Sequence, residues 1–309
     1  MRKFFTGKTV MVAGLCFLTA LLVNSRAELA SDVPAYNEGI IHYEHNDADK
    51  AIKSLKEALV ANFTEPPAGK MKEAIELSKD GQTEKAEEIL RALFDDEKTA
   101  ARARYELGLI YENANKLDAA AAMLRDAAIV IADNGAGYVG ADKCKICHIK
   151  QYNSWKTTKM AKTFDVLKPA AHSEAKVKLG FDPQKDYTKD AKCLACHTTG
   201  FGLPGGYKIP QDGDTRAIKA AKGNEGTTCE ACHGPGSKFL PIHKDIMTKK
   251  QYTQKELYQA GQYEIKASVC TTCHNMRNPT AGPDYHFDYE KHKTEDTHEN
   301  FPLKYRLKE

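Results

Sequence analysis

The sequence lacks the long apolar runs of a membrane protein beyond its N-terminal segment, and its first half lacks the cysteines of a disulfide framework. Its 309 residues include one tryptophan, and beyond residue 27 no apolar run is long enough to cross a bilayer as a helix. Cysteine is absent from residues 28–143, and residues 135–309 hold few apolar side chains for a conventional core. These absences exclude an integral membrane span in the mature chain. They also require something other than side chains to fill the second half.

Residues 1–27 have the features of a cleaved export signal. Basic residues precede an apolar stretch at 10–23, and "SRA" at 25–27 forms a small-residue cleavage site. An uncleaved anchor is the alternative. We therefore expect a soluble mature protein that is periplasmic or otherwise exported, and we expect Cys16 to be removed with the signal.

The two parts of the mature chain differ in the sign of their charge. Residues 28–134 contain 22 acidic and 13 basic side chains, a net charge of −9, whereas residues 135–309 contain 20 and 28, a net charge of +8. Such asymmetry can indicate nucleic-acid binding. An exported protein would not meet nucleic acid, so we expect no such partner.

Residues 28–134 are predicted to form an array of helical repeats. Three segments with a period near 34 residues can be superimposed: "NEGIIHYEHNDADKAIKSLKEAL", "KEAIELSKDGQTEKAEEILRAL" and "YELGLIYENANKLDAAAAMLRDA". A small residue recurs at one shared position and leucine at another; these are Gly39, Ala74 and Gly108, and Leu55, Leu90 and Leu124. The spacing resembles the tetratricopeptide repeat. An ordinary helical bundle is the alternative.

Residues 135–309, beyond the glycine-rich segment "DNGAGYVG" at 133–140, are predicted to form a loop-rich domain with four Cys-x-x-Cys-His motifs. The cysteine pairs are Cys144 and Cys147, Cys193 and Cys196, Cys229 and Cys232, and Cys270 and Cys273. The histidines are His148, His197, His233 and His274. This motif attaches c-type haem. The two thiols bond to the porphyrin vinyl groups, and the adjacent histidine ligates the iron from the proximal side.

Other uses of these cysteines leave the histidines unexplained. Disulfides need no histidine beside each pair, and a structural zinc site needs one tetrahedral ligand set rather than a repeated histidine. We therefore predict four covalently bound haem c groups. Their apolar rings would supply the missing core, and their propionates would offset part of the positive charge.

Longer segments of residues 138–309 resemble the tetrahaem cytochrome c-554 family. They are "YVGADKCKICH", "SWKTTKMAK", "DPQKDYTKDAKCLACHTTGFGLPGGY", "CEACHGPGSKF" and "CTTCHN". The resemblance implies a mainly helical, haem-packed fold and an electron carrier. It also implies that three haems have two axial ligands, while the second has an open face that can bind a small molecule such as nitric oxide. The N-terminal repeats lie outside the family pattern.

The resemblance also suggests distal ligands. His243 stands where the family has the sixth ligand of the first haem. His298, in "THENF", is the candidate for one of the later haems, and His286 and His292 compete with it.

Met160 occupies the position at which the family has a third distal histidine. A methionine thioether is a normal axial ligand of c-type haem and raises its reduction potential relative to histidine. We therefore consider a His/Met haem, the fourth by analogy. In the alternatives Met160 packs beside a ring, and the site is either open or filled by another histidine such as His172.

Two functions follow. The first is electron transfer between redox partners, such as a multihaem oxidoreductase or other cytochromes, with the repeat domain docking a partner or another copy of the chain. The second is an enzyme that reduces a small nitrogen oxide, such as nitric oxide, at the open second haem. We identify no catalytic residue, because no side chain is recognisably placed as a proton donor.

Overall fold

The computed structural model describes residues 34–243, 251–280 and 285–307. Within these ranges the regular structure is helical, apart from isolated bridges that pair Thr198 with Glu225 and Tyr252 with Arg306. The prediction of a mainly α chain is confirmed. In the same ranges no helix combines the length and the apolar character that crossing a membrane would require. The predicted export signal lies outside the described residues.

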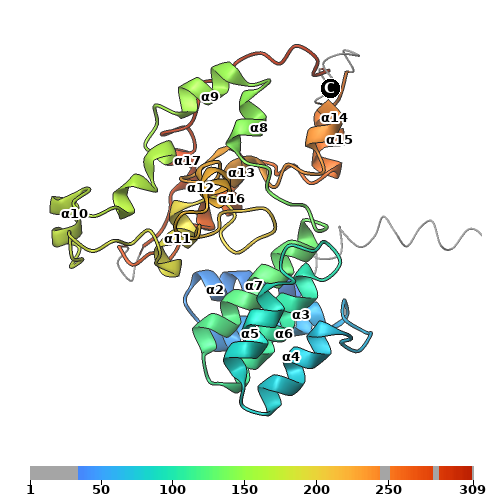
Figure 1. Ribbon diagram of the computed structural model, residues 1–309. Coiled ribbons are helices and arrows are strands. Elements are labelled where there is room, and N and C mark those ends of the chain that lie inside the picture. Colours follow the sequence, from blue (N-terminus) through green and yellow to red (C-terminus); the bar gives the residue numbers. More distant parts are fainter. Residues whose placement is uncertain (1–33, 244–250, 281–284, 308–309) are drawn as a thin grey trace, which may run out of the picture.

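The repeat region consists of three antiparallel helix pairs (Figure 1). They are α2 (Pro34–Glu44) with α3 (Ala48–Val60), α4 (Lys70–Lys79) with α5 (Thr83–Arg91), and α6 (Ala100–Asn113) with α7 (Leu117–Ala132). Each pair turns through a residue with positive φ: Asn46, Gly81 or Asn115. Glycine and asparagine tolerate this left-handed conformation best. The same turn at the same place in all three pairs confirms the predicted repeat.

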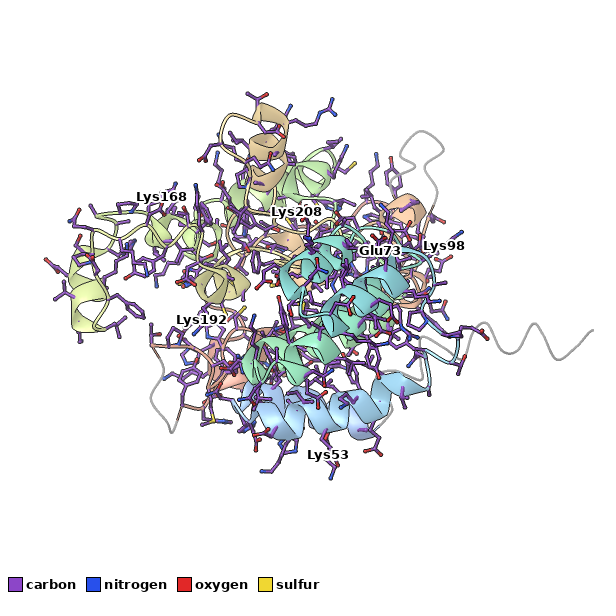
Figure 2. The ribbon with its side chains drawn as sticks, turned by 60° about the horizontal axis from the view of Figure 1, so that its bottom comes forward. Lys53, Glu73, Lys98, Lys168, Lys192 and Lys208 are labelled. Carbon is purple, nitrogen blue, oxygen red and sulfur yellow. The ribbon has the colours of Figure 1, made fainter. Side chains whose placement is uncertain are left out.

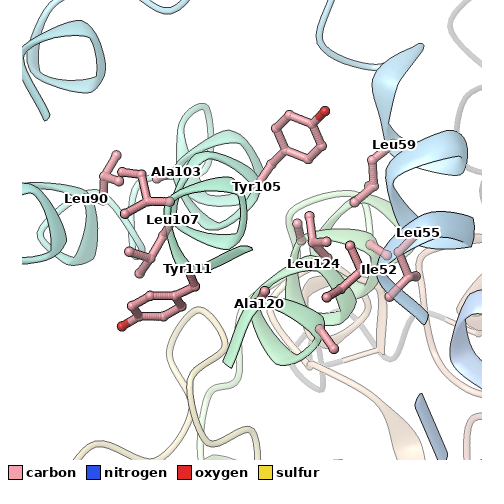
Figure 3. Close-up of a cluster of buried hydrophobic side chains, with 14 of the residues drawn as sticks. Ile52, Leu55, Leu59, Leu90, Ala103, Tyr105, Leu107, Tyr111, Ala120 and Leu124 are labelled. Atoms are coloured by element: carbon pink, nitrogen blue, oxygen red, sulfur yellow. The ribbon is translucent and has the colours of Figure 1, made fainter. Parts of the chain in front are cut away.

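Small residues let the paired helices approach closely. A Cβ atom on Gly39 would lie 2.6 Å from Leu55 Cγ, and one on Gly108 would lie 2.9 Å from Leu124 Cγ. Leu55, Leu90 and Leu124 are fully buried, in a cluster of leucines, alanines and tyrosines (Figure 3). Burial of this apolar cluster stabilises the array.

The helix pairs do not stack in chain order. Outside its own pair, α3 packs on α7, whereas α4 and α5 pack on α6, so the third pair lies between the first and the second. The linker at 61–69 runs beside α6, where the Phe63 and Tyr105 rings are 4.9 Å apart and the Phe63 carbonyl accepts a 3.0 Å hydrogen bond from Arg102 Nη1. Prolines in "TEPPAG" prevent this linker from continuing a helix.

The second half is built from short helices joined by loops (Figure 1). They are α8 (Ala141–Lys145), α9 (Ile149–Trp155), η1 (Met160–Lys162), η2 (Asp165–Leu167), α10 (Ser173–Lys178), α11 (Ala191–His197), α12 (Thr215–Lys222), α13 (Cys229–His233), α14 (Leu240–His243), α15 (Gln254–Gln259), α16 (Ala267–Thr271) and α17 (Tyr289–His292). The apolar clusters here are small: one surrounds Leu194 and Tyr207, and another surrounds Phe239 and Leu257. Side chains alone therefore form a thin core.

The two halves join through buried polar contacts. Arg104 of α6 is 1% exposed, and its guanidinium donates to the carbonyls of Gly202, Phe94 and Ala100. Gly202 belongs to the loop after the second motif, so α6 of the repeat region holds that loop in place.

Surface charges also join the halves, in keeping with their opposite net charge. Lys208 pairs with Asp95, and Lys238 Nζ lies 2.5 Å from Glu97 Oε1. Other lysines of both halves, Lys53 and Lys168 among them, are exposed (Figure 2).

Candidate haem-binding site

Each Cys-x-x-Cys-His motif forms one helical turn. In the first and fourth motifs the histidine N–H donates 2.9 Å to the carbonyl of the first cysteine, and the second and third motifs lie within α11 and α13. Residues three and four positions apart lie on one face of a helix. Both thiols and the imidazole of each motif therefore share a face, as attachment to a single porphyrin requires. Among the described residues, no disulfide joins any of the eight motif cysteines.

Cysteine contacts and helix packing place the motifs in the order first, third, fourth, second. The end of the second motif also bonds to residues just before the third: Gly226 N–H donates to the His197 carbonyl, and Thr228 N–H donates to Thr199 Oγ1. The thiols of Cys144 and Cys229 lie within hydrogen-bonding reach, and α13 also packs against both α8 and α16. Cys273 Sγ lies 3.9 Å from the Cys196 carbonyl. The motifs thus form a row in space that differs from their order in the chain.

Two motif histidines each face a second histidine. The ring centres of His148 and His243 are 6.0 Å apart, and those of His233 and His298 are 6.2 Å apart. With a metal–nitrogen bond of about 2.1 Å on each side, two imidazoles that bind one ion from opposite faces have ring centres about 6 Å apart. Both pairs therefore fit an iron between them.

The two facing histidines are oriented by backbone acceptors. His243 Nδ1–H donates to the Phe239 carbonyl at 2.9 Å, and His298 Nδ1–H donates to the Glu299 carbonyl at 2.8 Å. A hydrogen bond at Nδ1 fixes the tautomer that leaves Nε2 free to bind a metal.

His274 of the fourth motif lies near a different histidine, His292, with the Phe287 ring in contact with both. Its ring centre is 4.6 Å from that of Phe287, which is 5.8 Å from the ring centre of His292. His292 Nδ1 contacts Glu295 Oε2 at 2.7 Å, so its Nε2 is also free. The third competing histidine, His286, is exposed. The sequence placed His292 only among several alternatives, because its approach to His274 depends on the fold of the C-terminal loops.

His197 of the second motif has a different surrounding. Its Nδ1–H donates to the Thr163 carbonyl at 2.6 Å, a contact the sequence could not reveal because the acceptor is a backbone atom. Met160 lies nearby in η1 and is half-buried. Its carbonyl accepts from Thr227 N–H at 3.0 Å. His172 lies before α10, on the part of the second half that extends away from the other helices (Figure 1).

Burial keeps the motif histidines neutral. It lowers the pKa of His233 to about 4, an effect that the nearby imidazoles of His298 and His148 increase. Burial also lowers the pKa values of His148, His197 and His274. Neutral imidazole is the form that ligates metal. At neutral pH all four histidines are therefore in the ligating state.

Both halves of the chain are similar in sequence to known proteins. Residues 143–234 match the family described as cytochrome c554 and c-prime, and residues 71–137 match the tetratricopeptide repeat. A curated relative, cytochrome c-554 of Nitrosomonas europaea, is 38% identical over 144 residues, which is 45% of this chain and 58% of that protein. The chain therefore spans less than two thirds of the relative's length in that match.

A solved structure, the reduced state of cytochrome c554 from Nitrosomonas europaea, is 31% identical to this chain. It matches with a TM-score of 0.48 and covers 56% of this chain and 91% of its own. Residues 143–234 thus carry the sequence pattern of the cytochrome c554 family, and they follow a region, residues 71–137, that carries the pattern of the tetratricopeptide repeat.

Proposed function

We propose that the chain is an electron-transfer protein that carries four haem c groups, one on each motif. Haem supplies a one-electron couple between ferric and ferrous iron. The observation that carries the proposal is the contiguous row of motifs, because electron tunnelling falls steeply with distance. A single catalytic haem would need no such row, whereas a path for electrons does.

The chain's own residues attach and orient each group. The eight motif thiols would hold the porphyrins covalently, and His148, His197, His233 and His274 would be the proximal ligands. On the distal side, the geometry favours His243 for the first motif and His298 for the third.

A protein purified from a host that matures c-type cytochromes is expected to carry four haems. Intact-mass spectrometry should show four haem additions on a chain that begins near residue 28, because each motif presents both thiols and the histidine on one face. The absorption spectrum should show a Soret band that persists after acid–acetone extraction, which removes non-covalent haem. A colourless protein, or fewer than four additions at full occupancy, would contradict the proposal.

Two residues are candidates for the distal ligand of the fourth haem, His292 and Met160, and substitutions can distinguish them. His292 is near enough to His274 to lower its pKa, although Phe287 contacts both rings, and this nearness favours His292. His292→Ala is then expected to convert one low-spin ferric haem to high spin in the electron paramagnetic resonance spectrum, because the iron loses its sixth ligand. Met160→Ala should leave the spectrum unchanged. His286→Ala is the matched control, since His286 is exposed. A spin change in Met160→Ala alone would contradict His292 and make the methionine a ligand, either of the fourth haem or of the second, beside which Met160 lies.

The repeat region would dock a redox partner. One face is occupied by the chain's own second half, through Arg104 and through the ion pairs of Lys208 and Lys238. Docking would therefore use the outer surface of α4 and α5, at the end of the array away from α3. The opposite net charges of the two halves would also favour association of one copy of the chain with another. Export to the periplasm through the predicted signal is part of the same proposal.

A second candidate function is reduction of a small nitrogen oxide, such as nitric oxide, at the second motif. It is supported by His197, whose described neighbours include the Thr163 carbonyl but no facing histidine of the kind that His148 and His233 have. Nitric oxide consumption at a rate above that of simple electron leakage would favour this function over electron transfer alone.

A further inference from the structure

A half-buried carboxyl group lies where the two halves meet. Asp133 ends α7, and its N–H donates to the Ile129 carbonyl at 2.8 Å. Both of its carboxyl oxygens lie 2.9 Å from the hydroxyl of Tyr263, which belongs to the second half. The proposed electron path makes no use of this group.

The surroundings of Asp133 disfavour its charged form. Two effects change the pKa of Asp133: partial removal from water and the hydrogen bond from the Tyr263 hydroxyl. Among the described residues, no basic side chain pairs with its carboxylate. The C-terminal end of a helix is also an unfavourable place for a negative charge. Burial raises the pKa of Asp133 to about 7, although the Tyr263 hydrogen bond opposes the shift. The carboxyl group can therefore exchange a proton near neutral pH.

The other titratable groups around this site are tyrosines and one ion-paired arginine. Tyr36 of α2 and Tyr138 both sense the charge of Asp133, and Tyr138 is within hydrogen-bonding reach of Tyr263. Arg125 of α7 also acts on both tyrosines, but it is paired with Asp126. Glu230 of α13 acts on Tyr138. Burial raises the pKa values of these tyrosines further above neutrality and also raises the pKa of Glu230, whereas Asp133 is the carboxyl group that bonds to Tyr263.

Tyr263 connects this carboxyl group to the third motif. Its N–H donates to the His233 carbonyl at 2.9 Å. A Cβ atom on Gly234 would lie 2.7 Å from Tyr263 Cδ1, so the ring packs directly against the residue that follows His233. Asp133 thus lies one side chain away from the motif that occupies the second place in the row.

We propose that Asp133 is a proton-binding site coupled to electron transfer at the third motif, an inference that rests on the proposed electron-carrier function. When a one-electron donor protein reduces the ferric iron to ferrous, the Asp133 carboxylate takes one proton from solvent and becomes a neutral acid. When the electron passes to an acceptor, the proton returns to solvent. One electron and one proton enter and leave together, and no other bond changes. A carboxylate nearby opposes an added electron, and protonation removes that opposition.

Redox titrations of the holoprotein at several pH values test this coupling. In the wild type, one component should become harder to reduce as pH rises through neutrality. The limit is a tenfold change in its reduction equilibrium per pH unit, which is about 59 mV for a one-electron couple. Asp133→Asn, which is permanently neutral, should keep that component near its low-pH potential and remove the slope. Tyr263→Phe should retain the slope but move it to higher pH, because the charged carboxylate loses a hydrogen bond.

Asp49→Asn is the matched control, because Asp49 is an exposed aspartate on α3 of the same repeat region. It should leave the pH profile unchanged. Reduced-minus-oxidised infrared spectra of the wild type should show a new carbonyl stretch of a protonated carboxyl group, and this measurement needs no variant to fold. The coupling is wrong if the haems titrate normally but Asp133→Asn changes the pH dependence of no component, or if the infrared spectra show no carboxyl band. Either result would leave the electron-transfer function intact. A protein without haem would instead overturn the proposed function itself.

Discussion

Replacing both Cys270 and Cys273 with serine is expected to isolate the haem of the second motif from the other two. The fourth motif lies between the third and the second. Its helix α16 packs on α13 of the third motif, and Cys273 contacts Cys196 of the second. Removing its haem therefore interrupts the row of haems, although residues 197–199 of the polypeptide still contact residues 226–228 beside the third motif. We expect electrons to redistribute between the second haem and the rest more slowly by orders of magnitude. Stopped-flow absorption after mixing with substoichiometric reductant measures this redistribution.

The matched control removes a haem from the end of the row. Cys144→Ser with Cys147→Ser also deletes one haem, but the third, fourth and second motifs stay contiguous. Redistribution among these three haems should remain fast. If the two double variants equilibrate at the same rate, the order of the motifs in the electron path is not the one that the structure indicates.

Glu230→Ala is expected to cause a large loss of stability in the second half. Glu230 is 1% exposed, and its carboxylate accepts hydrogen bonds from the N–H groups of Val139, Gly140 and Gly236 at 2.7–3.1 Å. The substitution leaves three buried donors without an acceptor, at about 1–3 kcal/mol for each unsatisfied group. We expect the free energy of unfolding to fall by about 3–5 kcal/mol in total. Urea titration followed by circular dichroism measures the change.

Glu174→Ala provides the comparison for this loss, since Glu174 is an exposed glutamate on α10. Its stability change should be within about 0.5 kcal/mol of zero. Glu230 also ties the third motif to residues 139–140, just ahead of the first motif. The Soret and visible bands of these two haems should therefore shift in Glu230→Ala before global unfolding. A loss no larger than that of Glu174→Ala would show that the three N–H groups find other partners.

The local features of this protein could be predicted from the sequence because they depend on short spacings. Cysteines three apart with a histidine four positions after the first share one helical face wherever a helical turn forms, so the haem motif needs no tertiary information. The same holds for the repeats. Gly39 and Gly108 meet Leu55 and Leu124 within their own helix pairs, and each pair turns at a residue suited to positive φ.

Other features depended on contacts between distant segments. The sequence could not show that α3 packs on α7, because a linker that leaves the helical pattern can return to any exposed apolar face. Nor could it show that His292 rather than His286 approaches His274, or that Asp133 meets Tyr263. The sequence of a loop without periodic patterning does not predict which distant residues the loop contacts.

The sequence by itself determined which residues can hold haem and that the first half is a helical repeat. The tertiary structure decided the order of the motifs, the histidines that face the first and third of them, and the contact of Asp133 with Tyr263 at the junction. The physical reason is the range of the interactions. Helical spacing acts over three or four residues, whereas the contact between the fourth and second motifs and that of Asp133 join segments 77 and 130 residues apart.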